Sequence, residues 1–363
     1  MKGKRLVVKV GSSSLTDQHG CISEQKIKAL VVQIAELLKR DQQKVVLVSS
    51  GAVATGLGRL GWSRSQITMP EKQAAAAVGQ GLLIERYRTL FIEHGIEIAQ
   101  LLLTRSDIEH RHRFICIRNT IESLLRNNIL PIINENDTVA VDEIRFGDND
   151  TLGSLVALVA EADLLVLLTD IDGLYTANPK KDAQAKRIDE VWEITAELHQ
   201  SADDQGSAVG TGGMQTKLAA AEIATKAGID VVIAASTEPN VLHRICAGEK
   251  VGTRFYASRR LPSKKSWLAF GTRHEGELVI DQGAVEALLY RSGSLLLAGI
   301  QQVSGDFHEG EVVLIQSPEG KQVAKGITNF SKEDLQLLLR KKENGEQLPK
   351  LHEVVHRDYM VVF

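Results

Sequence analysis

Short apolar runs alternate with amphipathic helical stretches through most of the chain, and this alternation constrains the fold more than any other feature. The runs predict buried strands at residues 5–10, 44–48, 96–103, 129–133, 164–168 and 229–234. Strands that alternate with helices build a mostly parallel sheet sandwiched by helices, and ligands then bind beyond the carboxyl ends of the strands. We therefore expect an α/β fold with its site at one edge of a sheet.

Four of the predicted strands end in turns rich in glycine or in small polar residues, at 11–14, 49–52, 134–137 and 169–170. Such turns bring backbone N–H groups and helix N-termini to bear on an anion, and the turn at 134–137 suits a small polar ligand such as an amino acid. An ordinary strand-to-helix connection would have a similar composition. All four turns are nevertheless expected at the same edge of the sheet, and this coincidence indicates a site more strongly than any single turn.

A fifth turn, at 147–151, lies between an alternating segment at 139–146, expected to form a hairpin arm, and an alanine- and leucine-rich helix at 152–162. Glycine, aspartate and asparagine are the commonest turn residues, so Asn149 or Asp150 could simply be the N-cap of that helix. The other turns, together with two lysines, favour a chemical role instead.

Lys9 lies inside the first predicted strand, and Lys217 lies in the first turn of a helix predicted at 214–227, after a glycine-rich segment. A lysine in a strand could also belong to an edge strand and have a solvated tip. The spacing of neither a Walker A motif nor a GxGxxG motif is present. The two lysines still supply cations for a moving phosphoryl group, and Asp150 and Asp170 supply acidic groups that place Mg²⁺ or the lysines. A carboxylate acceptor would suit this set, because it is already ionised and needs no general base.

The composition argues against several classes of protein. The 363 residues are 43% hydrophobic and 25% charged, which is typical of a soluble globular protein with two domains, and a formal net charge of −3 does not favour nucleic-acid or membrane-surface binding. No apolar run approaches the roughly 20 residues that span a bilayer, or forms a signal-peptide core near the start. Three widely separated cysteines, Cys21, Cys116 and Cys246, support neither a disulfide framework nor a CxxC metal site, so a cytoplasmic location is expected.

Taken together, the motifs resemble those of a known family, in the same order over the whole chain. They are Lys9-Val10-Gly11-Ser12-Ser13, Ser50-Gly51-Ala52, Asn134-Glu135-Asn136-Asp137, Gly147-Asp148-Asn149-Asp150, Leu167-Leu168-Thr169-Asp170 and Gly210-Thr211-Gly212-Gly213-Met214 to Lys217. This set is similar to that of the glutamate 5-kinases of the amino acid kinase superfamily. The resemblance implies the amino acid kinase fold and transfer of the ATP γ-phosphoryl group to the side-chain carboxylate of L-glutamate, the first step of proline biosynthesis. Asn178, where Asp is expected before the proline, is a small departure.

The resemblance also implies roles for individual residues. Lys9 and Lys217 would stabilise the transferring phosphoryl group, and Asp150 would hold both lysines without acting as a general base. The residues expected to bind glutamate are Ser50, Gly51, Asp137 and Asn149. Those expected to bind ATP are Lys9, Gly11, Thr169, Asp170, Thr211, Gly212, Gly213, Met214 and Lys217. Mg²⁺ would be the cofactor, held mainly by the ATP phosphates, with no protein ligand directly assigned.

The character of the sequence changes after residue 258, which divides the chain into a catalytic domain at 1–258, a basic linker at 259–274 and a C-terminal domain at 275–363. Short alternating strands are predicted in the last at 276–280, 294–299, 311–316 and 322–327, with a helix at 331–340. This small β-rich domain resembles the PUA domain of many bacterial glutamate 5-kinases. PUA modules bind RNA in other proteins, but residues 271–363 hold 10 Lys/Arg against 14 Asp/Glu, a net of −4 that opposes RNA binding.

Two alternatives stay open at this point. The chain could be a sibling kinase that phosphorylates aspartate or N-acetylglutamate, or the PUA domain could have an RNA-binding role. As partners, the resemblance implies L-glutamate and ATP, a homo-oligomer, and a hand-off of the labile acyl phosphate to the next enzyme of the pathway. Neither RNA nor a membrane is expected as a partner.

Overall fold

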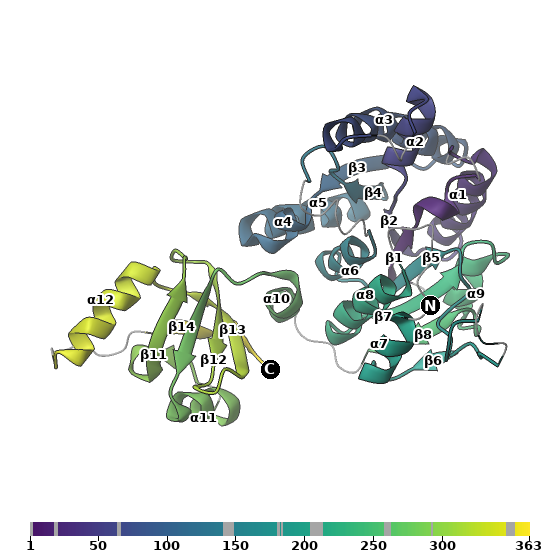
Figure 1. Cartoon of the computed structure of the whole chain (residues 1–363). Coiled ribbons are helices and arrows are strands. Elements are labelled where there is room, and N and C mark those ends of the chain that lie inside the picture. The colour runs from purple at the N-terminus through teal and green to yellow at the C-terminus, as the bar shows by residue number, and fades with distance from the viewer. Residues whose placement is uncertain are drawn as a thin grey trace. The chain divides into compact units, whose positions relative to one another are not determined.

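The computed structural model of the chain describes residues 3–17, 21–63, 67–140, 149–179, 182, 184–203, 213–257, 263–291, 293–345 and 353–363. The chain divides into two compact units, Met1–Arg260 and Leu261–Phe363 (Figure 1). Each unit has its own sheet and its own hydrophobic core, as is typical of separate domains.

The sheet of the first unit has eight strands in the order β3-β4-β2-β1-β5-β7-β8-β6. Their bounds are β1 Arg5–Val10, β2 Lys44–Val48, β3 Ile98–Leu103, β4 Leu130–Glu135, β5 Leu164–Thr169, β6 Glu190–Val191, β7 Asp230–Ala235 and β8 Thr253–Phe255. The six neighbouring strands β3-β4-β2-β1-β5-β7 all pair in parallel. Strand β8 pairs antiparallel with β7, and β6 pairs parallel with β8. The prediction of a mostly parallel sheet is therefore confirmed, and β6 and β8 are additions to it.

Helices cover both faces of this sheet, as predicted (Figure 1). Successive residues of a strand point to opposite faces, so Leu6, Val8 and Val10 of β1 pack into a core with α1, α3 and α9, whereas Lys9 faces α6. The bounds on the first face are α1 Glu24–Lys39, α3 Met69–Glu93 and α9 Val241–Ala247. Those on the second face are α5 Arg111–Arg126, α6 Asn149–Val159 and α8 Met214–Lys226, and the remaining helices are α2 Ala52–Leu60, α4 Arg105–Glu109 and α7 Ala196–Asp203.

Helix α6 begins at Asn149, three residues before the start predicted at 152. The first turn of α6 therefore includes Asn149 and Asp150, and neither residue precedes the helix as an N-cap. The hairpin arm predicted at 139–146 lies for the most part outside the described residues, as do Gly147 and Asp148.

Helices α2 and α3 pack closely enough that only glycine fits at two contact positions. A Cβ atom added to Gly56 of α2 would lie 1.8 Å from the carbonyl oxygen of Ala75, and one added to Gly79 of α3 would lie 1.8 Å from that of Ala52. Because Ala52 opens α2 four residues after the last residue of β2, this contact holds the carboxyl end of β2 close to the long helix α3.

The second unit has a six-stranded sheet in the order β10-β14-β13-β12-β9-β11. The strands are β9 Gly276–Ile280, β10 Leu295–Leu296, β11 Ile300–Gly305, β12 Val312–Gln316, β13 Gln322–Thr328 and β14 Glu353–Val362, and the helices are α10 Ser263–Ser266, a π-helix at Trp267–Gly271, α11 Gln282–Tyr290 and α12 Lys332–Glu343. The β-rich character is as predicted. The strand predicted at 294–299 is wrong in extent, because β10 stops at Leu296 and a 3-10 helix follows at Leu297–Gly299.

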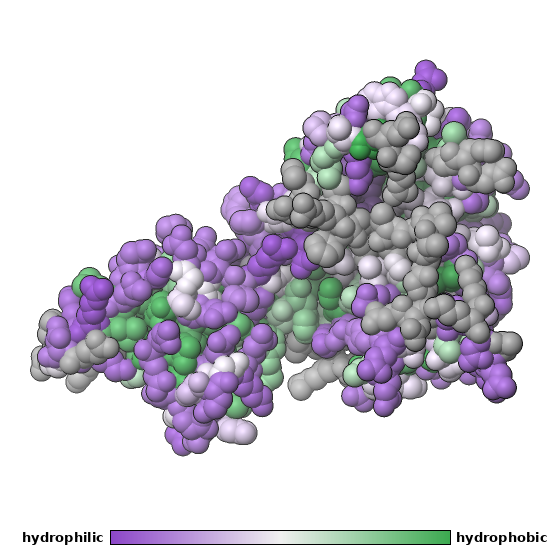
Figure 2. Space-filling view, viewed as in Figure 1, coloured by the Kyte–Doolittle hydropathy of each residue, from purple (hydrophilic) through white to green (hydrophobic). Residues whose placement is uncertain are grey.

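Among the described residues, no helix is both long enough and apolar enough to cross a membrane. In the view of Figure 2, hydrophilic residues predominate on the coloured surface of both units.

Candidate active site

The carboxyl ends of four neighbouring strands bring the predicted turns together. In the order β4-β2-β1-β5, each strand pairs in parallel with the next, and Lys9 of β1 lies opposite Val48 of β2 and Leu167 of β5. Parallel strands end at the same edge of a sheet, so the residues that follow β1, β2, β4 and β5 meet there. The prediction that the turns share one edge is confirmed.

Lys9 belongs to a central strand, because β1 lies between β2 and β5. The alternative of an edge-strand lysine with a solvated tip is wrong, since only 5% of Lys9 is exposed. Helix α6 packs on its stem, where a Cβ atom added to Gly153 would lie 3.2 Å from Cβ and Cγ of Lys9. This packing directs the ammonium group of Lys9 along the sheet edge to the start of α6.

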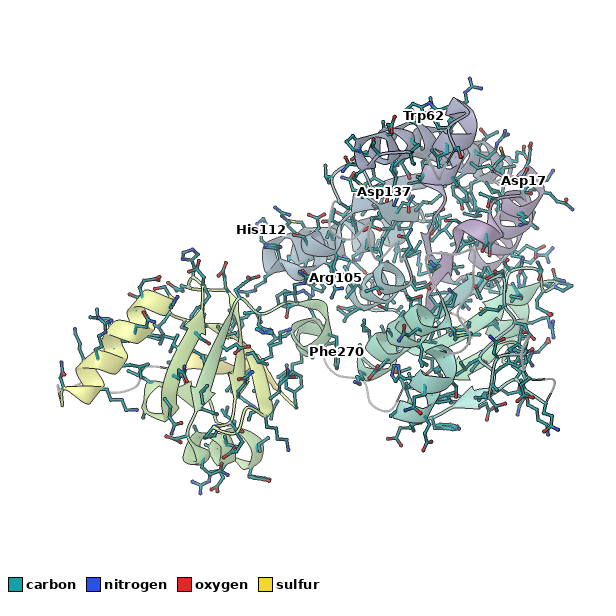
Figure 3. The ribbon with its side chains drawn as sticks, viewed as in Figure 1. Asp17, Trp62, Arg105, His112, Asp137 and Phe270 are labelled. Atoms are coloured by element: carbon teal, nitrogen blue, oxygen red, sulfur yellow. The ribbon has the colours of Figure 1, made fainter. Side chains whose placement is uncertain are left out.

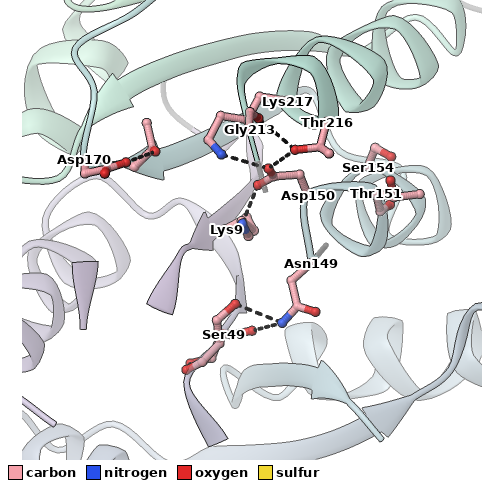
Figure 4. Close-up of polar contacts among 12 residues, drawn as sticks. Lys9, Ser49, Asn149, Asp150, Thr151, Ser154, Asp170, Gly213, Thr216 and Lys217 are labelled. Atoms are coloured by element: carbon pink, nitrogen blue, oxygen red, sulfur yellow. Dashed lines mark hydrogen bonds and ion pairs between the residues drawn. The ribbon is translucent and has the colours of Figure 1, made fainter. Parts of the chain in front are cut away.

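Asp150 lies between the two lysines that the sequence singled out (Figure 4). Its Oδ1 accepts a hydrogen bond from Nζ of Lys9, and its Oδ2 accepts one from Nζ of Lys217 at 3.0 Å. Thr216 Oγ1 lies 3.2 Å from the same Oδ2. Asp150 is fully buried, and Lys217 is 6% exposed.

In this cluster, two ammonium groups face one carboxylate. Charges that are held out of water interact more strongly than charges at the surface, and buried ions need partners. Two ammonium groups held together at this edge of the sheet attract an anion such as a phosphoryl group. The geometry therefore fits binding of an anion beside Lys9 and Lys217.

Asn149 points the opposite way from Asp150, toward the end of β2 (Figure 4). Its Nδ2 lies 2.9 Å from the carbonyl oxygen of Ser49, 2.9 Å from Oγ of Ser50 and 3.0 Å from Oδ1 of Asn134. Consecutive residues of one helix turn thus join two groups, the lysines on one side and the ends of β2 and β4 on the other.

Two residues of this site, Gln80 and Tyr87, were not among those predicted from the sequence, and both contact residues of the predicted turns. Asn134 Nδ2 donates to Oε1 of Gln80 at 2.7 Å, and Oγ of Ser49 lies 3.0 Å from the hydroxyl of Tyr87. Burial raises the pKa of the Tyr87 phenol. Gln80 and Tyr87 belong to α3, far from the turns in sequence, and nothing in the local pattern of that helix distinguishes them from ordinary packing residues.

Asp137 follows β4 and is labelled in Figure 3. Burial raises the pKa of its carboxyl group to about 6, although the positive charge of Lys72 acts in the opposite direction. A carboxylate that pays for desolvation in this way gains from a cationic group placed beside it. Asp137 therefore suits the ammonium group of an amino acid.

The glycines predicted at the site leave room at the strand ends. The N–H of Gly11 donates to the carbonyl oxygen of Leu168 at 3.2 Å, and a Cβ atom at Gly11 would lie 4.0 Å from Nζ of Lys9. Gly51 has a φ of +96°, a left-handed conformation that glycine adopts at little cost. Both positions leave the backbone open to a ligand.

The remaining predicted residues lie around the end of β5 and the start of α8. Thr169 is buried and its Oγ1 donates to Oδ1 of the exposed Asp170 at 2.9 Å. Gly213 caps the N-terminus of α8, and Met214 is its buried first residue. Thr211 and Gly212 lie outside the described residues.

Comparison with known proteins now bears on this site. The sequence profile of the Amino acid kinase family matches residues 4–235, which include β1 to β7 and the site. A glutamate 5-kinase of Carboxydothermus hydrogenoformans is 47% identical over 365 residues, which cover 99% of this chain and 97% of that protein. The chain belongs to the amino acid kinase family, among the glutamate 5-kinases. The resemblance noted in the sequence is confirmed.

Other glutamate 5-kinases are equally similar over their whole length. That of Cupriavidus metallidurans is 46% identical and covers 99% of this chain and 98% of its own, and glutamate 5-kinase 2 of Bacillus licheniformis is 46% identical and covers 99% and 96%. The PUA domain profile matches residues 276–344, so the second unit is a PUA domain. Among solved structures, a UMP kinase from Bacillus anthracis has a TM-score of 0.48 at 17% identity, over 72% of this chain and 99% of its own.

A kinase that uses ATP generally works with a divalent metal ion. Among the described residues of this glutamate 5-kinase family member, no group of three or more His, Cys, Asp or Glu side chains could hold a metal by itself. Asp170 is an exposed oxygen donor at the edge of the site. This donor set fits a metal that arrives with the phosphates of a nucleotide and needs few protein ligands.

Proposed function

We propose that this chain transfers the γ-phosphoryl group of ATP to the side-chain carboxylate of L-glutamate and forms L-glutamyl 5-phosphate, the first step of proline biosynthesis. The observation that carries the proposal is the buried cluster of Lys9, Asp150 and Lys217, which holds two ammonium groups together at the sheet edge. The near full-length similarity to glutamate 5-kinases supports glutamate as the acceptor in preference to aspartate or N-acetylglutamate.

In the reaction, an oxygen of the glutamate side-chain carboxylate forms a bond to the γ-phosphorus. The bond from that phosphorus to the oxygen it shares with the β-phosphate breaks, and its electron pair leaves with ADP. No proton is removed from the acceptor, so no general base is needed. Lys9 and Lys217 stabilise the negative charge of the moving phosphoryl group, which is the main contribution a protein makes to this chemistry.

Asp150 positions the two lysines and does not accept a proton from the substrate. Each of its carboxylate oxygens holds one ammonium group, so Lys9 and Lys217 are kept apart at a set spacing. Holding reacting and stabilising groups in place before reaction lowers the barrier, because little has to reorganise during it. Asp150 is thus a positioning residue.

Glutamate binds between the ends of β2 and β4 and the start of α6. Asp137, with its desolvated carboxylate, pairs with the α-ammonium group, and Asn149 and Ser50 supply hydrogen bonds. Gly51 leaves the backbone open to the substrate. The side-chain carboxylate then points to the lysines on the other side of Asn149.

ATP binds beside the ends of β1 and β5 and the start of α8. Its phosphates approach Lys9, Gly11 and Lys217, and the helix N-terminus at Gly213 and Met214 adds N–H groups and a favourable dipole. Thr169 and Asp170 lie on this side of the site, and from the resemblance we expect Thr211 and Gly212 to bind ATP as well. Mg²⁺, bound mainly by the ATP phosphates, neutralises part of their charge when present.

The product has a consequence for its transfer: an acyl phosphate is readily hydrolysed, so a hand-off to the next enzyme of the pathway protects it. The homo-oligomer is proposed from the resemblance to glutamate 5-kinases, and the cytoplasmic location from the three widely separated cysteines. The PUA domain has a structural or regulatory role, because the net charge of −4 over residues 271–363 opposes binding to RNA phosphates.

Trapping of the acyl phosphate tests the proposal. The purified chain is incubated with ATP, Mg²⁺ and hydroxylamine, and glutamate, aspartate or N-acetylglutamate is tried in turn as acceptor. We expect hydroxamate from glutamate, with formation prevented when EDTA removes the metal. Hydroxamate from aspartate or N-acetylglutamate, with none from glutamate, would contradict the assignment.

A further inference from the structure

The side chains that hold Asn149 form a chain of amide groups that reaches back to α3. Gln80 of α3 bonds to Asn134 at the end of β4, and Asn134 bonds to Asn149 at the start of α6. Gln80 is 9% exposed and Asn134 is 2% exposed. These residues lie far apart in sequence, and only the fold brings them into one line.

Two backbone groups determine which way each amide points. The N–H of Glu135, which can only donate, bonds to Oδ1 of Asn134 at 3.0 Å, so Nδ2 of Asn134 faces Gln80. The carbonyl of Ser49, which can only accept, lies 2.9 Å from Nδ2 of Asn149. The NH₂ group of Asn149 is therefore turned into the protein, and its Oδ1 accepts no hydrogen bond from any described residue.

Oδ1 of Asn149, which no described residue bonds, determines what this side chain recognises. A carbonyl oxygen accepts hydrogen bonds, and the one strong donor group of an α-amino acid with a carboxylate side chain is its ammonium group. If the side-chain amide of Asn149 were rotated by 180°, it would present its NH₂ group, a donor, to the substrate. The orientation of this amide thus favours an ammonium group over a carboxylate.

Gln80 keeps this orientation because it satisfies the buried NH₂ group of Asn134. Without Oε1 of Gln80, that NH₂ group would lose its acceptor in a place where an unpaired donor is costly. Other acceptors, the Ser49 carbonyl and Ser50 Oγ, surround Asn149. Only the N–H of Glu135 would then hold Asn134 in this orientation, and a turn of its NH₂ group to that side would displace the amide of Asn149.

We propose that Gln80 is a positioning residue, which acts through Asn134 to keep Oδ1 of Asn149 directed at the ammonium group of the amino-acid substrate. This inference rests on the proposed function, because it concerns how the acceptor of the phosphoryl group is recognised. It concerns neither the lysines nor ATP.

Steady-state kinetics with Gln80→Leu test the proposal, with Gln33→Leu as the matched control. Gln33 of α1 is also 9% exposed, but its Oε1 accepts from the N–H of Leu242 of α9 and not from Asn134. Gln80→Leu should raise KM for glutamate about tenfold, the effect of one unsatisfied buried donor, and change kcat and KM for ATP little. Gln33→Leu should leave all three as in the unaltered chain, and Gln80→Glu, which keeps an acceptor oxygen, should largely restore KM.

Two further measurements separate positioning from packing. Glutarate, which lacks the ammonium group, is used as a competitive inhibitor, and Gln80→Leu should not weaken it. In the Asn134→Asp background, Gln80→Leu should not raise KM for glutamate further, because a carboxylate has no NH₂ group to misorient and presents oxygen to Asn149 either way.

The inference is overturned if Gln80→Leu behaves as Gln33→Leu, if it weakens glutarate as much as glutamate, or if its effect persists with Asn134→Asp. Gln80→Met, judged by the same criteria, takes its place if Gln80→Leu does not fold. If the unaltered chain forms no hydroxamate from glutamate, the proposed function itself fails, and this outcome is distinct from those above.

Discussion

Replacing Asp150 with asparagine should separate the role of this carboxylate in stability from its role in catalysis. Asparagine has almost the same shape as aspartate but no charge, so the packing of α6 on β1 is kept. The fully buried carboxylate holds Lys9 and Lys217, which are 5% and 6% exposed. In the variant, two buried ammonium groups would face a neutral amide.

The structure indicates the size of the effect on stability. Removing one partner of a buried ion pair costs about 3–5 kcal/mol, because the charge left behind is uncompensated. That loss is a large part of the roughly 5–15 kcal/mol by which native proteins are stable. The cluster becomes more positive by one charge, since the carboxylate is lost and both lysines remain. Pyrophosphate should therefore raise the melting temperature of Asp150→Asn by more than that of the unaltered chain.

The effect on turnover should be larger than the effect on substrate binding. Without Asp150 the two ammonium groups repel each other, and a displacement of about 1 Å in such a site can cost about 100-fold in rate. We expect kcat to fall by about 100-fold or more, with a smaller change in KM for glutamate. Hydroxamate formation measures kcat and KM. Thermal melting with and without pyrophosphate measures the effect on stability.

Asp163→Asn is the matched control. Asp163 accepts a hydrogen bond from the backbone N–H of Arg5 at 2.9 Å, at the start of β1 and thus at the opposite edge of the same sheet. This variant should lose some stability and keep its kcat. A kcat for Asp150→Asn within a few-fold of the unaltered chain would refute the reasoning, and so would an equal loss of kcat in Asp163→Asn.

Three further predictions follow from single residues. Asp137→Asn should raise the melting temperature at pH 7.5 but not at pH 4. The carboxyl pKa is raised from 3.8 to about 6, so ionisation of Asp137 costs stability as the pH rises through that window. The unaltered chain, but not the variant, should show a KM for glutamate that rises below pH 6. Gly51→Ala should lower the free energy of unfolding by about 1 kcal/mol, because the alanine would have to adopt a φ of +96°. Gly81→Ala, in open space inside α3, should raise it by about 0.5–1 kcal/mol, and thermal melting measures both variants. Lys217→Met should lower kcat much more than it raises KM for glutamate, because the interaction of Lys217 with the phosphoryl group strengthens in the transition state. Steady-state rates measure both constants, and a change in KM alone would contradict the proposed role.

The strands of the central sheet could be predicted because their sequences are nearly continuous apolar runs, as is typical of strands buried on both faces. β5, for example, is predicted at 164–168 and found at Leu164–Thr169. Strands β6 and β8 were missed because they are two and three residues long, with a charged residue in each. Such short segments become strands only through the neighbours with which they pair.

The same limit applies to the site. Lys9, Asp150 and Lys217 stand next to turns whose glycines and acceptors attract attention, so the sequence could single them out. Gln80 and Tyr87 lie on a long helix where a buried polar residue looks like any other. Their role depends on the residues that the end of β4 and the end of β2 present to them.

The sequence by itself determined the alternation of strands and helices, and thereby a sheet edge at which cationic, acidic and glycine-rich turns had to meet. Only the tertiary structure decided which groups pair there. Asp150 lies 141 residues from Lys9 and 67 from Lys217 along the chain, yet it bonds to both. No local pattern encodes such a contact, because it depends on how β1, α6 and α8 pack, and this packing turned a turn-like acidic residue into the buried centre of the site.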